Sequence, residues 1–519
     1  MNTSAYYTHD AAAARAPGPI SEPVIEARLP IIDAHHHLWL IPEAILAAMR
    51  ESATLAPVLR GKARYLLEDF LADAQAAHNV RATVFAECHA MYRAHGPEEY
   101  RSLGEVEFAN GAAAMSASGI FGEVQVCAGI IGHVDLRLGD RVQQVLESHV
   151  QAGGGRYRGV RNVTHHDADP DVLGSWGGYG AHALLDDGLR RGFKWLGKFE
   201  LSFDAYVLEP QLPDVIDLAR SFPDTQIVVD HAGAPVGVGR YAGKRGERFP
   251  IWRDHMRTLS RCDNVAVKLG GLGMPTAGFA SFRSDPPATS EQLAAEWKPY
   301  VETCIEAFGA GRCMFESNYP VDAGSCSYAV LWNAFKRLAA GASTDEKAAL
   351  FSGTAARVYR LGLYRDGLTA AYQGELIGEA LYRELSRRAA DRDQQIKLRA
   401  IAEVERATHR RLRPIADRLL IGAAEADCQP IVERRAQQIA RLGWPEFIDM
   451  ALRDWPPYIE RFEALRALAP AGDAAAVQWL VDHEVALVKF ASVEKDAMGS
   501  DASLQVLQAF LQACEARQA

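Results

Sequence analysis

The stretch Ile31-Ile32-Asp33-Ala34-His35 is a short β-branched run that ends in polar residues, and it is the first of eight such runs before residue 365. Longer segments with helical spacing separate the runs, as in repeated βα units around a parallel sheet. The other seven candidate strands are 81–87, 124–132, 157–163, 195–202, 226–231, 265–268 and 313–317. Eight strands in about 335 residues predict an α/β fold, the (β/α)8 TIM barrel, whose chemistry lies at the carboxyl ends of the strands.

The pattern changes after residue 365, where strand-like runs disappear and Ala, Leu, Glu and Arg recur at helical spacing as far as Ala519. Candidate helices cover 368–390, 394–421, 430–442, 445–469 (interrupted by Pro456-Pro457), 473–496 and 501–517. This is enough for a helical bundle. We therefore predict three parts: a flexible leader over residues 1–28, the barrel over 29–365, and an all-α bundle domain over 366–519.

Composition excludes several classes of partner. Lys and Arg total 56 against 66 Asp and Glu, a net charge of −10, so the chain has no overall positive field for nucleic acid. No apolar stretch has the length of a membrane helix, and the first 28 residues lack the apolar core of a signal peptide. The eight cysteines form no CxxC pair, which fits a reducing cytoplasm. We expect a cytoplasmic protein that acts on a small-molecule substrate.

Histidines mark the mouth of the predicted barrel. The first strand continues as Asp33-Ala34-His35-His36-His37-Leu38-Trp39. Because alternate residues of a strand share a face, His35 and His37 should point together into the mouth while His36 points away. The run 226–231 ends in a third imidazole, His231, at the same face. Converging imidazoles can bind a divalent metal, or polarise a substrate carbonyl without one.

Other strand ends carry charged or polar residues, which are unfavourable in strands unless paired or functional. For Glu87, Arg161 and Lys268 the alternative is a structural ion pair at the barrel rim. Arg161 has the forked donor geometry that a substrate carboxylate needs. We assign substrate binding to Arg161, Glu87, Asn318 and Tyr319. We assign catalytic roles to His35, His37, His231, Glu316, Asp322 and Lys268.

In these segments the chain resembles the amidohydrolase superfamily, and within it the amidohydrolase 2 branch of TIM-barrel hydrolases that includes lactonases. The resemblance covers nearly all of residues 30–364 in order. The matching segments are Asp33–Trp39, Glu87–Arg93, Gly104–Phe108, Arg158–Arg161, Asp230–Gly233, Val267–Met274 and Phe315–Asp322. It implies a barrel hydrolase that uses His35, His37 and His231, either with one divalent metal (zinc or manganese) held by these histidines or without a metal.

The chain departs from the superfamily pattern at the end of the last strand. The resemblance implies an Asp there as metal ligand and general base, and this chain has Asn318. An amide cannot accept a proton from water at neutral pH. The base must therefore be another carboxylate, and Glu316, Asp322, Asp230 and Glu87 all remain open. The lysine that some members carboxylate to bridge two metals has no clear counterpart except Lys198, so we do not expect a binuclear centre.

The predicted reaction is the addition of water to an ester or lactone carbonyl of a small acidic substrate, with a carboxylate activating the water and Arg161 holding the acidic group. One alternative is non-oxidative decarboxylation by the same residues. A second is a catalytically altered barrel that acts as a scaffold, with the helical domain as the interaction module. A third is a two-centre enzyme in which iron-dependent oxidation in the bundle feeds the barrel.

Three glutamates decide how the helical domain is interpreted. Glu375, Glu405 and Glu484 each fall within an apolar stripe and should point inward. Inward glutamates from several helices resemble the metal sites of ferritin-like bundles, so these three are candidate metal ligands. The usual Glu-x-x-His repeat is missing, and His483 sits about 100° from Glu484 around the helix. We therefore do not expect a di-iron site. The alternatives are pairing of these glutamates with Arg399, Arg406 or Arg410, and a bundle used for homo-oligomerisation or for covering the barrel mouth.

Overall fold

The computed structural model describes residues 22–48, 56–173, 179–419, 421–422 and 425–516. The chain forms two compact units, Met1–Arg360 and Leu361–Ala519. The predicted leader over residues 1–28 lies outside the described residues as far as residue 21. Its last residues are anchored to the first unit, because Ser290 N donates to Glu22 Oε1 over 2.7 Å and Lys336 Nζ donates to Glu26 O over 2.9 Å.

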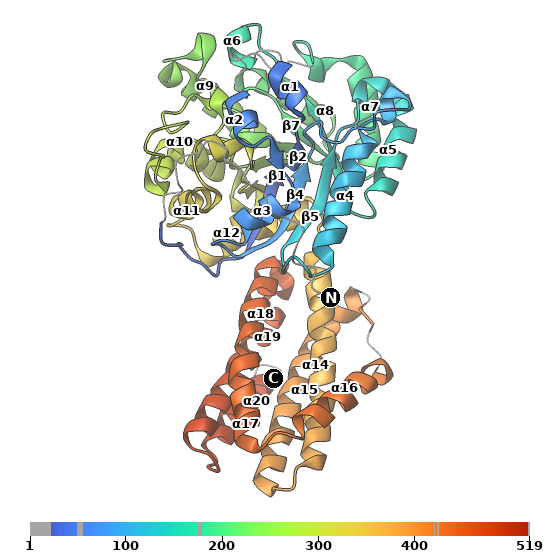
Figure 1. Ribbon diagram of the computed structural model, residues 1–519, viewed down its shortest axis with the longest axis vertical. Coiled ribbons are helices and arrows are strands. Elements are labelled where there is room, and N and C mark those ends of the chain that lie inside the picture. Colours follow the sequence, from blue (N-terminus) through green and yellow to red (C-terminus); the bar gives the residue numbers. More distant parts are fainter. Residues whose placement is uncertain (1–21, 49–55, 174–178, 420, 423–424, 517–519) are drawn as a thin grey trace. The chain divides into compact units, whose positions relative to one another are not determined.

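Eight parallel strands form one sheet in the order in which they occur in the chain (Figure 1). They are β1 (Ile31–His36), β4 (Val80–Ala86), β5 (Gln125–Gly132), β6 (Tyr157–Val163), β7 (Ser202–Tyr206), β8 (Ile227–Val229), β9 (Val265–Lys268) and β10 (Cys313–Met314). The chain after β10 returns to β1, where His37 N donates to Tyr319 O and Asn318 N donates to His35 O, both over 2.8 Å. The sheet therefore curves round to its first strand, and the predicted TIM barrel is confirmed.

The fifth barrel strand is displaced from its predicted position. The sequence predicts a strand over 195–202, and this was wrong: residues 195–198 end helix α7 (Asp187–Lys198), and the strand β7 begins at Ser202. The buried residues of α7 recur at helical spacing and are Leu189, Gly192, Phe193 and Leu196. Its amino end is capped by Asp186, whose side chain accepts a hydrogen bond from Leu189 N.

Helices surround the barrel sheet and cover its outer face. They are α3 (Leu67–Ala74), α4 (Leu103–Ala117), α5 (Val142–Ala152), α7, α8 (Leu212–Ser221), α9 (Arg245–Leu259), α10 (Ser290–Phe308), α11 (Tyr328–Leu338), α12 (Thr344–Ala348) and α13 (Thr354–Val358). Short elements complete the unit: α1 (Glu43–Ala48), α2 (Ala56–Gly61), α6 (Pro170–Leu173) and an antiparallel pair, β2 (Trp39–Leu40) and β3 (Arg64–Tyr65). Trp252, Trp297 and Trp332 on α9, α10 and α11 are fully buried, and each stabilises the core by the order of a few kcal/mol.

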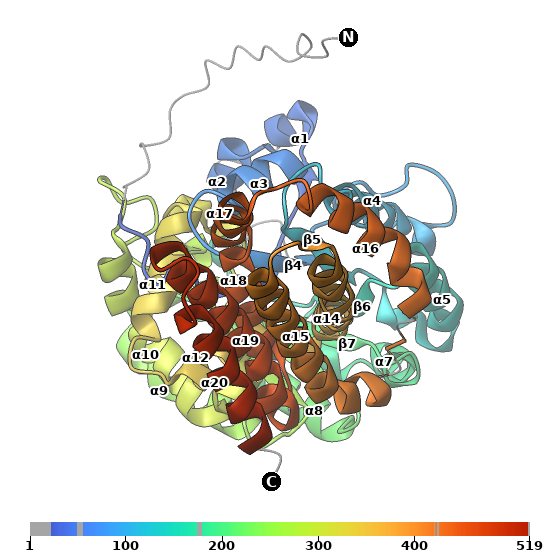
Figure 2. The same cartoon turned by 90° about the horizontal axis from the view of Figure 1, so that it is seen from below.

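The second unit is helical throughout its described residues, as predicted. Its helices are α14 (Leu363–Arg388), α15 (Arg392–Arg418), α16 (Glu425–Ile439), α17 (Trp444–Asp454), α18 (Pro456–Leu468), α19 (Ala471–Asp496) and α20 (Ala502–Ala516). Figure 2 shows α14, α15 and α19 side by side within this unit. Pro456 begins α18 where the sequence predicts an interruption. None of the helices in the described part of the chain has the length and apolar character needed to cross a membrane.

Candidate active site in the barrel

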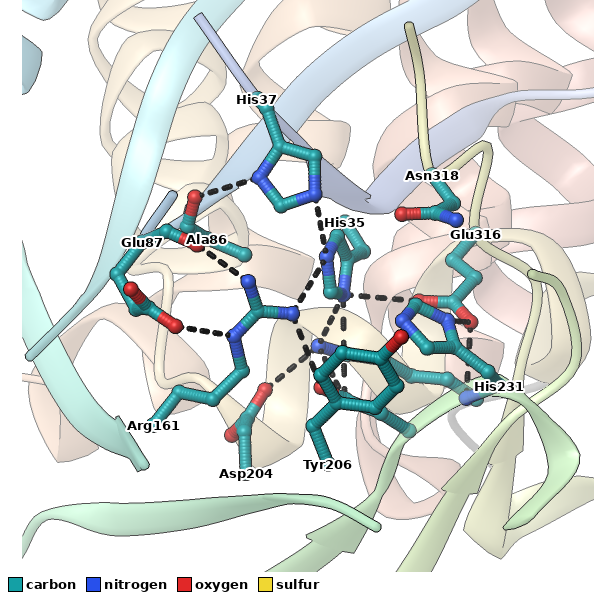
Figure 3. A network of polar contacts seen from close by, with 12 residues as sticks. His35, His37, Ala86, Glu87, Arg161, Asp204, Tyr206, His231, Glu316 and Asn318 are labelled. Carbon is teal, nitrogen blue, oxygen red and sulfur yellow. Dashed lines mark hydrogen bonds and ion pairs between the residues drawn. The ribbon is translucent and has the colours of Figure 1, made fainter. Parts of the chain in front are cut away.

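Side chains from the carboxyl ends of seven strands meet in one buried network (Figure 3). Its members are His35 and His37 from β1 and the residue after it, Glu87 after β4, Arg161 in β6, Asp204 in β7, Asp230 and His231 after β8, Lys268 in β9 and Glu316 after β10. Each of these residues is at most 4% exposed. The network therefore contains seven of the ten predicted barrel residues, each within hydrogen-bond or ion-pair distance of another member.

The two histidines of the first strand point together, as alternation predicts. His35 Nε2 lies 3.2 Å from His37 Nε2. His36 points to the other side of the sheet, where its ring stacks on Phe70 and its Nε2 lies 2.8 Å from Thr83 Oγ1. His37 Nδ1 donates to Ala86 O over 2.8 Å, and since a carbonyl only accepts, His37 Nε2 carries a lone pair.

His35 is held between two cations. Arg161 Nη1 lies 3.2 Å from His35 Nε2, and Lys268 Nζ lies 3.1 Å from His35 Nδ1. Burial and the two adjacent cations hold the pKa of His35 well below its usual range. Burial and Arg161 do the same for the pKa of His37. Both imidazoles are therefore neutral at pH 7 and available as ligands or as hydrogen-bonding groups.

His231 is fixed by Glu316. Glu316 Oε1 accepts from His231 Nδ1 over 2.7 Å and from His231 N over 3.1 Å, so His231 Nδ1 carries a proton and Nε2 is the ring atom left for another partner. His231 has a left-handed backbone with φ of 57°. Gly271 packs against its ring, and a Cβ at that glycine would lie 2.4 Å from the imidazole. The left-handed backbone of His231 and the absence of a side chain at Gly271 together allow this placement of the imidazole.

Arg161 is committed mainly to the protein. Its Nε donates to Glu87 Oε1 over 2.9 Å, its Nη2 donates to the Glu87 carbonyl oxygen, and its Nη1 lies 3.4 Å from Asp230 Oδ2 as well as near His35. A guanidinium has five N–H groups, so these contacts leave one Nη2 hydrogen for a substrate oxygen. Its predicted role in binding a substrate carboxylate stays a prediction.

The carboxylates of the network differ in charge state because they differ in partners. Burial opposes the ionisation of Glu87, but Arg161, His89 and His133 together outweigh it and the pKa of Glu87 lies below its usual range. Burial likewise opposes ionisation of Asp230, and Lys268, His231 and Arg161 lower its pKa. These two carboxylates are therefore ionised and bound to cations. That makes both of them weak bases at neutral pH.

Asp322 has a different environment. Its Oδ1 accepts from Asn318 Nδ2 over 2.8 Å and its Oδ2 accepts from Gly273 N over 3.0 Å, both neutral donors. Burial raises the pKa of Asp322 to about 7, although nearby His231 favours the ionised form. A carboxyl group with this pKa can accept a proton at pH 7 and also return it. Of the four carboxylates left open by the sequence, Asp322 therefore fits the general base best.

One predicted residue and one considered residue have other surroundings. Tyr319 is buried, and its hydroxyl group donates to Cys326 O over 2.6 Å, so its predicted contact with substrate stays a prediction. Lys198 lies at the end of α7 with its Nζ 3.7 Å from the Trp195 ring centroid, away from any strand end. It is therefore no counterpart of a metal-bridging lysine.

Two further residues, Asp204 and Tyr359, belong to the network or contact it, and the sequence pattern assigns neither of them a role. Lys268 Nζ pairs with Asp204 Oδ2 over 2.6 Å and with Asp230 Oδ1 over 3.1 Å. Tyr359 donates its hydroxyl proton to Asp204 Oδ2 over 2.8 Å. Burial raises the pKa of Asp204 to about 6, with Lys268 opposing the rise. Asp204 could have been identified because it lies in a strand-like run of residues. Tyr359 follows a helix, and no sequence pattern marks it.

The donor set of the network fits one divalent metal ion. Ligand atoms of His35, Asp230 and His231 lie within 4.8 Å of one another, and His37 Nε2 lies 3.2 Å from His35 Nε2. Four buried carboxylates outnumber the two buried cations of this network, so it carries an excess of negative charge that a divalent ion would balance. The four carboxylates are Glu87, Asp204, Asp230 and Glu316. The two cations are Arg161 and Lys268.

A second group of possible ligands lies next to the network. Glu87, His89 and His133 also place ligand atoms within 4.8 Å of one another. His89 is exposed, and its ring centroid lies 5.5 Å from that of His133. His133 donates toward Arg161 O over 3.3 Å. His89 is therefore the most solvent-exposed member of this group.

A parallel (β/α)8 barrel with histidines and carboxylates at its strand ends defines the class of TIM-barrel hydrolases. Residues 32–361 match the sequence pattern of the amidohydrolase family, described as "Amidohydrolase". The chain belongs to this family. The match ends one residue beyond the boundary between the two compact units, so the helical unit lies almost entirely outside it.

Similar proteins cover the barrel. The chain is 32% identical over 342 residues to the uncharacterised protein y4mH of Sinorhizobium fredii, a match covering 64% of this chain and 98% of that protein. It is 30% identical over 236 residues to an L-fucono-1,5-lactonase of Burkholderia multivorans, covering 45% of this chain and 72% of the lactonase. The crystal structure of a zinc-bound amidohydrolase from Burkholderia multivorans is similar at 26% identity and a TM-score of 0.48, covering 64% of this chain and 99% of that one.

Proposed function

We propose that the barrel is a hydrolase that adds water to a lactone or ester bond of a small acidic substrate. The observation that carries the proposal is that the carboxyl ends of the barrel strands hold both a cluster of buried imidazoles and Asp322, a carboxyl group whose pKa burial raises to about 7. Hydrolysis needs a group that takes a proton from water and returns it to the leaving oxygen, and Asp322 has the matching pKa.

In this reaction Asp322 accepts a proton from water as the water oxygen attacks the carbonyl carbon. The carbon–oxygen bond to the leaving group then breaks, and the leaving oxygen takes the proton from Asp322. Glu316 orients His231, and Lys268 and Arg161 hold His35, so that the imidazoles keep one orientation throughout. The remaining Arg161 N–H is the group that we propose for the acidic substituent of the substrate.

A divalent ion held by His35, His37, Asp230 and His231 would supply Lewis-acid stabilisation of the negative charge on the carbonyl oxygen. We propose zinc or manganese, since imidazole and carboxylate together suit both ions. The lone pair of His37 Nε2 lies only 3.2 Å from His35 Nε2, so the space between them must hold either a proton on His35 Nε2 or a metal ion.

The curated relatives support a lactone as the reactive bond. L-fucono-1,5-lactonases of Burkholderia multivorans and Burkholderia ambifaria are 30% and 28% identical to this chain, over 236 and 238 residues. The first compounds to test are therefore sugar-acid 1,5-lactones, including L-fucono-1,5-lactone. The proposed binding of an acidic substituent would be tested by comparing these compounds with lactones that carry a carboxylate.

The test is proton release from these lactones at constant pH, with the wild-type protein and with Asp322→Asn. Release above the uncatalysed rate that is lost in Asp322→Asn supports the proposal. Carbon dioxide release from aromatic carboxylic acids without any lactone hydrolysis would contradict it in favour of decarboxylation. The absence of both reactions would contradict it in favour of a barrel that acts as a scaffold.

A further inference from the structure

Four ionisable side chains meet in the interior of the helical unit. Glu375 comes from α14, Glu405 from α15, and His483 and Glu484 from α19. They are 3%, 7%, 1% and 8% exposed. His483 Nε2 lies 3.5 Å from Glu375 Oε2, 3.9 Å from Glu405 Oε2 and 3.7 Å from Glu484 Oε1. Three carboxyl groups therefore surround one nitrogen atom.

That nitrogen atom is a lone-pair donor. His483 Nδ1 donates to Leu480 O over 2.8 Å, and because a carbonyl only accepts, the ring proton is on Nδ1. His483 Nε2 is buried and has no hydrogen-bond partner among the described residues, and the same holds for Glu375 Oε2 and Glu484 Oε2. Three unpaired ligand atoms thus face one another in a dry interior, an arrangement that costs free energy unless a cation lies among them.

Arginines do not balance the cluster. The sequence allows Arg399, Arg406 or Arg410 as partners, but Arg406 pairs with Glu379 and Glu403, and Arg399 donates to Ser386 Oγ. No arginine or lysine among the described residues lies within ion-pair distance of Glu375, Glu405 or Glu484. The fold also makes room for these groups, since a Cβ at Gly378 would lie 2.6 Å from Glu405 Cδ.

We propose that Glu375, Glu405, His483 and Glu484 bind a single first-row divalent transition metal ion, such as manganese or iron, at a site separate from the barrel. Carboxylate oxygens with one imidazole form a mixed ligand set that suits these ions. Ligand atoms of Glu375, Glu405 and His483 already lie within 4.8 Å of one another, so one ion can reach all of them with small side-chain adjustments. One imidazole among three carboxylates supports one ion rather than a pair that each needs a histidine.

His483 was undervalued from the sequence because it lies next to Glu484. Neighbouring residues of a helix diverge by 100° at the backbone. Both side chains nevertheless turn toward the space between α14 and α15, and His483 Nε2 approaches Glu484 Oε1 to 3.7 Å.

The test uses the full chain, stripped with a chelator and titrated with manganese chloride, while free manganese is followed by electron paramagnetic resonance. A His35→Gln/His231→Gln background removes the histidine ligands of the barrel. We expect this protein to bind one manganese ion. Adding Glu484→Gln or His483→Gln should abolish that binding or weaken it at least about tenfold. Adding Glu403→Gln, an exposed residue of α15, should leave it unchanged.

The glutamine variants should fold, because glutamine has nearly the size and shape of glutamate and brings no charge into the buried interior. A second measurement leaves the bundle intact: the manganese bound to the His35→Gln/His231→Gln protein should show magnetic coupling to the 14N nucleus of one imidazole. Absence of bound manganese, absence of nitrogen coupling, or equal affinity in the Glu484→Gln and Glu403→Gln proteins would each overturn the proposal. None of these readouts depends on the barrel reaction.

Discussion

Asn318 Nδ2 donates a hydrogen bond to Asp322 Oδ1 over 2.8 Å, so an amide at the end of the last barrel strand holds a carboxyl group four residues further on. Asn318 is itself fixed, because its backbone N donates to His35 O over 2.8 Å and its φ is 51°. The family pattern leads one to expect an acid at position 318. This chain has an amide there, and that amide orients a different acid, Asp322.

The first prediction concerns Asp322 as the base. In Asp322→Asn the new Oδ1 can still accept from Gly273 N, and the new Nδ2 can donate to Asn318 Oδ1 once the Asn318 amide rotates, but the side chain can no longer accept a proton from water. We expect kcat/KM for lactone hydrolysis to fall by about 10²-fold or more, with the fold unchanged. Asp224→Asn, an exposed residue of the same unit, is the control. If both variants hydrolyse lactones at the wild-type rate, the base is another group.

The second prediction concerns the pH dependence of the same reaction. The base must be deprotonated to act, and burial raises the pKa of Asp322 to about 7. We therefore expect kcat/KM to increase with pH and to level off above about 7. Asn318→Ala removes a donor that favours the charged carboxylate, so the midpoint should move to higher pH. An unchanged midpoint in Asn318→Ala would show that a different group controls the profile.

The sequence predicts the barrel well because each strand is a short β-branched run with a polar end. It misplaces the fifth strand, since Trp195 and Leu196 continue the apolar spacing of α7 and the true strand has only five residues. His35, His37 and His231 could be predicted because alternation and strand position alone bring them to the mouth.

The roles of the carboxylates could not be predicted, since they depend on partners that are distant in sequence. Glu316 is bound to His231, 85 residues away, and Glu87 to Arg161, 74 residues away. Their chemistry follows from which of them meets a cation. Only the folded chain shows that Asp322 meets neutral donors instead.

The third prediction concerns the metal of the barrel. We expect a chelator to lower lactone hydrolysis at least about tenfold, and zinc or manganese to restore it. His231→Gln should abolish the recovery because it removes one proposed ligand. Glu484→Gln should recover fully because its change lies in the other unit. Undiminished hydrolysis after complete metal removal would instead favour catalysis by the imidazoles and cations alone.

The fourth prediction is a pH dependence of stability that arises from Glu105 on α4. Its carboxyl group is buried, and burial raises its pKa to about 8, although Oε1 accepts from Cys88 N and Ala90 N. A folded-state pKa above the unfolded value means that the stabilising contribution is complete below about pH 4.5 and is lost as pH rises toward 8.

Glu105→Gln removes this titration and keeps an oxygen atom for both backbone donors. We expect the barrel of Glu105→Gln to gain stability relative to wild type as pH rises from 5 to 8, by up to about 1.4 kcal/mol per pH unit. Urea unfolding at several pH values measures this difference in the free energy of unfolding. Glu107→Gln, exposed on the same helix, should follow the wild type. A constant difference between Glu105→Gln and wild type would mean that Glu105 is ionised in the folded barrel.

The last prediction tests the close packing of α14 on α15. A Cβ at Gly378 would lie 2.6 Å from Glu405 Cδ, whereas a Cβ at Gly374, one turn earlier, meets nothing within 4 Å. In Gly378→Ala the Glu405 carboxyl group must move to admit the methyl group, so this variant should be less stable than Gly374→Ala. Gly374→Ala should stabilise it by about 1 kcal/mol, since alanine has the higher helix propensity. Calorimetry separates the two, because a lower melting temperature in Gly378→Ala than in Gly374→Ala requires that Gly378 makes room for Glu405. Equal upward shifts would show that the helices lie further apart.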